Sequence, residues 1–164
     1  MFWTNLLFYR TTFRQKGLFL ACLKLYMLRL FILIRPFSKY LLIAWVLAII
    51  TVSSIPSIPA LKIHTANADI RLDYLIHFLE YGILSFLAFL SFAGSKFKPG
   101  FRKYILITIG LILFAFLDEF HQKLIPGRTF NVKDILSNAV GIIAAVIFCI
   151  AAFRKIARNV GKTV

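Results

Sequence analysis

Carboxylate side chains are scarce in this sequence, and their positions suggest chemistry. The 164 residues include six acids, which are Asp69, Asp73, Glu80, Asp118, Glu119 and Asp134. Each lies at or near the end of a long apolar block, and His77, Gln122 and Arg128 lie close to them in the chain. Carboxylates beside a histidine can move protons in acid–base catalysis, and they can also hold a polar ligand. These residues are therefore the candidate site.

The first group of polar residues has the spacing of one helix face. Asp73, His77 and Tyr81 are spaced i, i+4 and i+8, and Glu80 directly precedes Tyr81. At about 100° per residue, all four side chains fall within a stripe roughly 100° wide. A single helix would therefore present them to the same neighbours.

Two later pairs share a helix face in the same way, Asp118 with Gln122 and Asp134 with Asn138. Arg128 lies in the connection between them, and its planar, always charged guanidinium suits several carboxylates. Three helix ends are therefore expected to present polar stripes at one membrane level, with Arg128 among them.

The elements that must position these groups are membrane-spanning helices. The chain is 60% hydrophobic and 16% charged, with a mean hydropathy of +0.84, outside the range of ordinary soluble domains. A spanning helix needs about 20 predominantly apolar residues. Four blocks approach or reach this length, at about 40–56, 73–93, 104–124 and 134–153. The sequence predicts an all-α polytopic membrane protein with a bundle of four transmembrane helices, joined by loops.

Small residues predict which helices approach closely. Gly141 and Ala145 continue the face of Asp134 and Asn138, and small residues one turn apart let two membrane helices pack at short distance. The fourth span is therefore expected to lie against another span along this face.

Three segments are expected from composition: a basic apolar segment at 1–39, the four-helix domain at 40–153 and a basic tail at 154–164. The first carries seven cations and no acid. It is interpreted either as an interfacial helix or as an extension upstream of a translation start at Met27.

The charge balance predicts orientation rather than nucleic-acid binding. The 20 Lys and Arg residues against six acids give a net charge of +14, and most cations flank the apolar blocks, where they contact lipid headgroups. We therefore expect membrane lipids as partners and no nucleic acid. The positive-inside rule predicts that both termini are cytoplasmic and that the loops after the first and third spans face outward, which places the acids outward.

Neither a disulfide framework nor a recognised metal motif is present. Cys22 and Cys149 are far apart in apolar stretches and are interpreted as packing residues. Glu119 and His121 lack the two-histidine spacing of zinc proteases. His77 with carboxylates would suit several divalent ions, but the pattern assigns no metal ligand and no cofactor.

The polar residues together form a longer motif. They read Asp73-x-x-x-His77-Phe78-x-x-Tyr81, then Asp118-Glu119-x-x-Gln122, then Pro126-Gly127-Arg128-x-x-x-x-x-Asp134-x-x-x-Asn138-x-x-Gly141. This pattern resembles the VanZ-like family of bacterial membrane proteins over about residues 40–150. Tyr74 stands where the family often has Lys, and Ala145 where it often has a second glycine. The family takes its name from a protein associated with low-level resistance to the glycopeptide teicoplanin.

The resemblance and the residues together support two hypotheses. In the first, a polar pocket open to the outer face binds an envelope component or a glycopeptide-like ligand and acts in antibiotic resistance or surface modification. Its ligand-binding residues would be Asp73, His77, Tyr81, Glu119, Gln122, Arg128, Asp134 and Asn138. In the second, the chain is a membrane-embedded hydrolase or transferase acting on a lipid-linked or cell-surface substrate. Its catalytic candidates would be His77, Glu80, Asp118 and Glu119.

Structural alternatives remain open at this stage. Arg128 can neutralise a carboxylate internally, and Asp134 can cap the helix it begins. All of the polar groups can also serve only as contacts that hold helices together.

Overall fold

The computed structural model describes Tyr26 and residues 29–57, 62–65, 68–94, 97 and 99–160. The chain divides into two compact units, Met1–Pro36 and Phe37–Val164. Of the first unit, the structure describes Tyr26 and residues 29–36, which are helical over 29–34 and enter the 3-10 turn η1 (Arg35–Phe37). The expectations for most of segment 1–39, for Met27 and for Cys22 lie outside the described residues.

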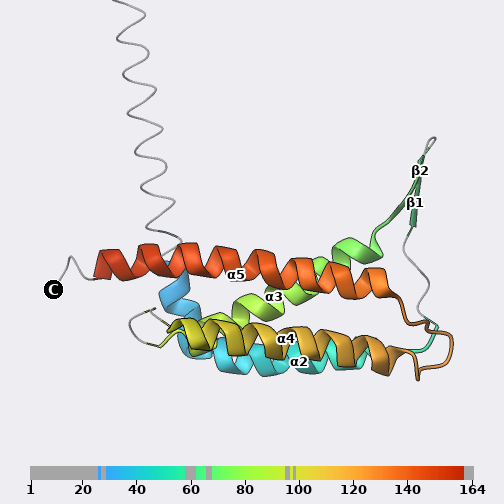
Figure 1. Ribbon diagram of the computed structural model, residues 1–164, viewed down its shortest axis with the longest axis horizontal. Coiled ribbons are helices and arrows are strands. Elements are labelled where there is room, and N and C mark those ends of the chain that lie inside the picture. The colour runs from blue at the N-terminus through green and yellow to red at the C-terminus, as the bar shows by residue number, and fades with distance from the viewer. Residues whose placement is uncertain are drawn as a thin grey trace, which may run out of the picture. The chain divides into compact units, whose positions relative to one another are not determined.

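The second unit is built from four long helices (Figure 1), α2 (Ser38–Ser53), α3 (Asp73–Phe92), α4 (Phe101–Gln122) and α5 (Val132–Val160). The predicted all-α class is confirmed. Among the residues that the structure describes, four helical segments are long and apolar enough to cross a membrane, at Arg29–Ser53, Asp73–Phe92, Phe101–Gln122 and Val132–Arg158. The protein is therefore a polytopic helical membrane protein.

Two helix boundaries differ from those predicted. α2 ends at Ser53, before the expected end at 56. Pro56 has no N–H to donate, and its ring disfavours helical geometry at the preceding residue, Ile55. α5 continues to Val160, so the basic stretch after 153 begins as helix. Phe153, Ile156 and Ala157 are buried, and this packing extends the helix.

The connection between α2 and α3 contains a hairpin that the sequence analysis missed. Strands β1 (Lys62–Thr65) and β2 (Ala68–Arg71) pair antiparallel, with Lys62 opposite Arg71 and Thr65 opposite Ala68. The sequence predicted only a loop there, because four-residue strands are too short to give a convincing alternating pattern.

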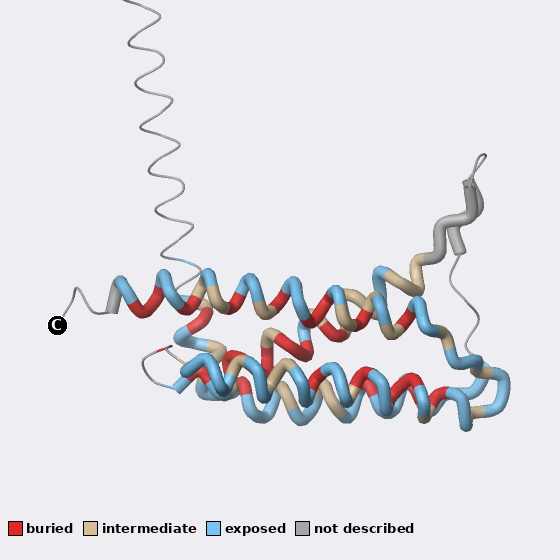
Figure 2. The backbone as a smooth tube through the Cα atoms, viewed as in Figure 1, coloured by how far each residue is buried: buried red, intermediate tan, exposed pale blue. Residues whose placement is uncertain are grey.

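α3 forms the core of the second unit. Its most extensive contacts are with α5, followed by α2. Figure 2 marks buried residues along the backbone of α3. They are Tyr81, Leu84, Ser85, Leu87, Ala88, Phe89 and Leu90. α4, by contrast, exposes large apolar side chains such as Leu113, Phe116 and Leu117. Such an exposed apolar face suits contact with lipid.

Gly141 sets the close approach of α3 and α5. A Cβ added there would collide with the backbone carbonyl oxygen of Phe78, and one added at Gly82 would lie 3.7 Å from the carbonyl oxygen of Gly141. One turn along, the Ser85 hydroxyl donates a hydrogen bond to the Ile142 carbonyl oxygen at 3.4 Å. The close helix contact predicted at Gly141 is confirmed.

Replacing Gly141 with alanine should therefore separate these helices. We expect Gly141→Ala to destabilise the protein by about 1–3 kcal/mol, because the added methyl group has no space and its neighbour is backbone. Thermal unfolding in detergent micelles measures the effect. The matched control is Gly110→Ala, in the middle of α4, where an added Cβ meets nothing within 4 Å. This variant should be about 0.5–1 kcal/mol more stable than the parent, through helix propensity alone. Equal unfolding midpoints for the two variants would contradict the conclusion that Gly141 is needed for the close approach of α3 and α5.

Candidate functional site

The alternating direction of the helices brings four helix ends together. The end of α2, the start of α3, the end of α4 and the start of α5 lie at one end of the second unit (Figure 1). Glu80, Asp118, Glu119 and Asp134 all lie within the helical turns at this end, and α3 begins there with Asp73. These carboxylates therefore lie at one end of the helical bundle, and the side of the membrane that this end faces stays a prediction.

Four side chains form a connected hydrogen-bond network across α3, α4 and the loop that follows α4. The Tyr81 hydroxyl donates to Asp118 Oδ2 at 3.0 Å, and Gln122 Nε2 donates to the same oxygen at 3.3 Å. Arg128 Nη2 donates to Gln122 Oε1. The Arg128 guanidinium is therefore linked to Asp118 through the side-chain amide of Gln122. The sequence had suggested a direct ion pair between Arg128 and a carboxylate.

The loop that carries Arg128 is held by the segment directly after α2. The Ser57 N–H donates to the Pro126 carbonyl oxygen at 3.2 Å. Gly127 next to it has φ +76°, a left-handed conformation that glycine adopts freely, and an added Cβ there would collide with Ser57. Pro126 and Gly127 form a turn, and its contact with Ser57 fixes the position of the adjoining Arg128.

Asn131 is a residue of the site that the sequence analysis missed. Its side-chain Oδ1 accepts the Lys133 N–H at 3.1 Å, so Asn131 caps α5, and the suggestion that Asp134 caps this helix is wrong. Its own N–H donates to Glu119 Oε1 at 2.8 Å. The signal was present in the sequence, since an asparagine directly before a helix is a preferred cap.

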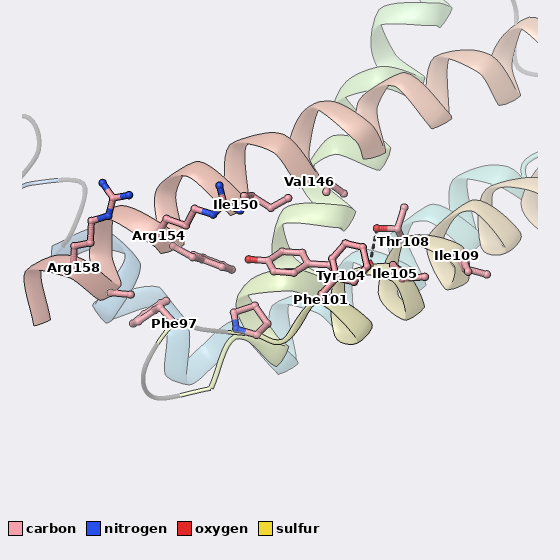
Figure 3. Close-up of a pocket in the computed structure, with 13 residues that line it drawn as sticks. Phe97, Phe101, Tyr104, Ile105, Thr108, Ile109, Val146, Ile150, Arg154 and Arg158 are labelled. Atoms are coloured by element: carbon pink, nitrogen blue, oxygen red, sulfur yellow. Dashed lines mark hydrogen bonds between the residues drawn. The ribbon is translucent and has the colours of Figure 1, made fainter. Parts of the chain in front are cut away.

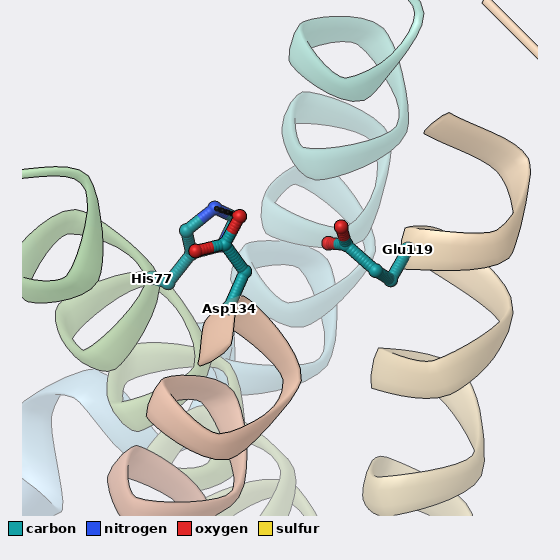
Figure 4. A group of neighbouring side chains, drawn as sticks. All are labelled: His77, Glu119 and Asp134. Atoms are coloured by element: carbon teal, nitrogen blue, oxygen red, sulfur yellow. Dashed lines mark ion pairs between the residues drawn. The ribbon is translucent and has the colours of Figure 1, made fainter. Parts of the chain in front are cut away.

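His77, Glu119 and Asp134 converge from three different helices (Figure 4). His77 Nε2 lies 3.7 Å from Asp134 Oδ2, and on the other side of the ring Nδ1 lies 4.0 Å from Glu80 Oε2. One ligand atom from each of His77, Glu119 and Asp134 lies within 4.8 Å of the other two. We call these three residues the His77 trio. Such a group can hold a cation, or exchange a proton between imidazole and carboxylate.

Several buried polar atoms at this end have no hydrogen-bond partner among the described residues. They include Glu119 Oε2, Asp134 Oδ1 and both amide atoms of Asn138. Glu119 and Asn138 are completely buried. An unsatisfied buried polar group costs about 1–3 kcal/mol, and more when it is charged. Atoms of this kind are available to a ligand.

Asp73, a predicted ligand-binding residue, lies less deeply. Asp73 begins α3 and is partly exposed, while His121 is partly buried near the end of α4. Asp69 and His64 belong to the hairpin, where only the backbone is described.

A groove of about 730 Å³ lies at the opposite end of the second unit. It is formed by the first half of α4 and the last half of α5, and its lining is mostly apolar (Figure 3). Tyr104 and Phe153 line it, with Arg154 and Arg158 along one side. None of the predicted site residues lines it, so the polar pocket predicted from sequence is a separate feature and stays a prediction.

Within the described residues, four membrane-length helices with a buried polar cluster at one end define a polytopic helical membrane protein. The family model of VanZ/LLP1 matches residues 2–154, and the chain belongs to this family. The resemblance inferred from the motif is thereby confirmed, and the match extends into the N-terminal segment. Comparisons with curated proteins and with solved structures gave no match.

The hydrogen bond from Tyr81 to Asp118 should carry measurable stability. We expect Tyr81→Phe to lower the free energy of unfolding by about 1.5–3 kcal/mol, because a bond to a charged acceptor is lost inside the bundle. A double-mutant cycle with Asp118→Ala, which leaves the Tyr81 hydroxyl without this acceptor, isolates the pair, and the two losses should not add. Tyr40→Phe is the control, because Tyr40 is 74% exposed. Strict additivity of Tyr81→Phe and Asp118→Ala would show that the two side chains do not interact.

Proposed function

We propose that the polar cluster is an outward-facing site that binds the polar part of a cell-envelope component at the outer leaflet. The observation that carries this proposal is the burial of Asp118, Glu119 and Asp134 at one end of the bundle, where Glu119 Oε2 and Asp134 Oδ1 have no hydrogen-bond partner among the described residues. Carboxylates in a membrane protein are expensive unless they meet a partner or water.

A role in helix packing alone does not account for the polar atoms of the cluster that lack hydrogen-bond partners among the described residues. Groups that only hold helices together would be expected to bond to one another, as Tyr81, Asp118 and Gln122 do. Glu119 Oε2 and the Asn138 amide have no such partner among the described residues. A ligand bearing hydroxyl or cationic groups would satisfy them.

The distribution of cations supports the outward orientation. Near the site, α4, α5 and the loop between them carry Lys123, Arg128 and Lys133. At the opposite end the same two helices carry Arg102, Lys103, Arg154, Lys155 and Arg158. The richer end is expected to be cytoplasmic under the positive-inside rule, and both termini would then lie on that side.

Membership of the VanZ/LLP1 family supports a role in the envelope of a bacterial cell. The function we propose is lowered access of a teicoplanin-type glycopeptide to its target, or modification of the cell surface, through binding at this site. Membrane lipids are the surrounding partners in either case.

Orientation can be tested by cysteine labelling in intact cells. In a variant without Cys22 and Cys149, we expect Thr129→Cys, in the exposed α4–α5 loop, to react with a membrane-impermeant maleimide added outside. Arg102→Cys, exposed at the opposite end, should react only after the membrane is permeabilised. The reverse labelling pattern would place the site on the cytoplasmic side and end the proposal.

The binding role predicts a phenotype that depends on the site. In a teicoplanin-susceptible bacterial host, the parent chain should raise the minimum inhibitory concentration, and His77→Ala, Glu119→Ala and Arg128→Ala should each abolish the effect because each removes a polar group of the cluster. Membrane insertion should be unchanged, as immunoblotting of membranes measures. The matched control is Arg102→Ala, which removes an exposed arginine at the far end. Parental resistance in all three site variants would refute the proposal.

A hydrolase or transferase acting on a lipid-linked substrate is the second candidate. It is favoured by His77, whose Nε2 faces the Asp134 carboxylate at 3.7 Å and could exchange protons with a substrate. Turnover of an envelope lipid by purified protein, lost in His77→Ala, would favour catalysis over binding alone.

A further inference from the structure

We propose that the His77 trio binds one divalent transition-metal ion, of the class of Zn²⁺ or Mn²⁺. The three residues come from α3, α4 and α5. Because they are far apart in the sequence, no local spacing motif predicts this group. The proposal uses the same end of the bundle as the ligand role above, but it does not depend on that role.

The first argument is geometric. One ligand atom from each residue lies within 4.8 Å of the other two. Around a tetrahedral ion with bonds of about 2.1 Å, ligand atoms stand about 3.4 Å apart. The His77 Nε2 to Asp134 Oδ2 distance of 3.7 Å is already close to that value. Small side-chain rotations would bring Glu119 to the same distance.

The second argument is the unused hydrogen-bonding capacity of the carboxylates. Glu119 is 0% exposed and Asp134 is 9% exposed, and each has one oxygen without a hydrogen-bond partner among the described residues. The Glu119 carboxylate points toward the other two side chains (Figure 4). Two buried carboxylates with one imidazole leave an excess of negative charge, which a divalent cation would compensate.

The third argument concerns the groups that would orient the ligands. Metal-binding residues are normally fixed by hydrogen bonds to their second heteroatom. Glu119 Oε1 already accepts the Asn131 N–H at 2.8 Å, which leaves Oε2 for the ion. His77 Nδ1 lies 4.0 Å from Glu80 Oε2 and has no hydrogen-bond partner among the described residues. A small side-chain rotation would let the Glu80 carboxylate accept the Nδ1–H while Nε2 faces Asp134.

The donor set also indicates the class of ion. One imidazole nitrogen and two carboxylate oxygens suit Zn²⁺, Mn²⁺ or Fe²⁺ better than Ca²⁺, which prefers oxygen ligands alone. Three protein ligands leave coordination positions for water or for an oxygen atom of a bound molecule.

The test is metal uptake by the full chain in lipid nanodiscs. After treatment with a chelator and dialysis, the parent protein should take up one Zn²⁺ or Mn²⁺ per chain, and its unfolding midpoint should rise with added metal. Glu119→Gln and Asp134→Asn should each weaken binding at least about tenfold. Glu119→Gln keeps the size of the side chain and an oxygen for the Asn131 N–H. His121→Gln is the matched control, because it removes a histidine of α4 outside the trio, and it should bind as the parent does.

A readout on the parent protein keeps the test decisive if a variant fails to fold. Zn²⁺ should protect His77, but not His121, from modification by diethyl pyrocarbonate, as peptide mass spectrometry measures. Absence of metal uptake by the parent would overturn the proposal. So would metal uptake by Glu119→Gln and Asp134→Asn that equals uptake by the parent, or equal protection of His77 and His121. Loss of the metal site alone would leave the requirement for Arg128 in the resistance assay intact, so the two proposals fail separately.

Discussion

The high cost of placing carboxylates inside a membrane protein is the constraint on which the rest of this structure depends. An ionised carboxylate cannot face lipid, so Asp118, Glu119 and Asp134 must point into the bundle and find partners there. Asp118 finds them in Tyr81 and Gln122. Glu119 finds one in the Asn131 backbone and keeps an oxygen without a partner among the described residues. This unused hydrogen-bonding capacity distinguishes the polar end of the bundle from ordinary helix packing.

Close packing of α3 against α5 makes that cluster possible. Because Gly141 has no side chain, its backbone approaches Phe78, and His77 on α3 is brought beside Asp134 on α5. The cap at Asn131 fixes where α5 begins and at the same time orients Glu119 of α4. One small residue and one capping residue thus position side chains from three helices.

The two ends of the bundle differ in chemical character. The end that gathers the carboxylates is polar and closely packed, whereas the other carries an apolar groove with Arg154 and Arg158 along its side. Cations at the ends of membrane helices contact lipid headgroups, which suits the end that carries the two arginines. This division also explains why the net charge of +14 accompanies a site made of acids.

The sequence by itself determined the class of protein and its family, and it predicted most of the polar residues that the structure gathers at one end. Hydropathy predicts the four spans, because lipid requires a similar minimum length of every crossing helix. It does not predict that the first helical segment begins as early as Arg29 or that the last continues to Arg158. Helical spacing correctly joined Asp118 to Gln122, and the long motif identified the family. The tertiary structure alone decided which atoms meet across helices. The bond from Arg128 to Gln122, the cap at Asn131 and the meeting of His77, Glu119 and Asp134 all depend on how helices distant in sequence are rotated against one another. Rotation is set by close contacts such as Gly141 on Phe78, and helical periodicity within one span carries no information about it.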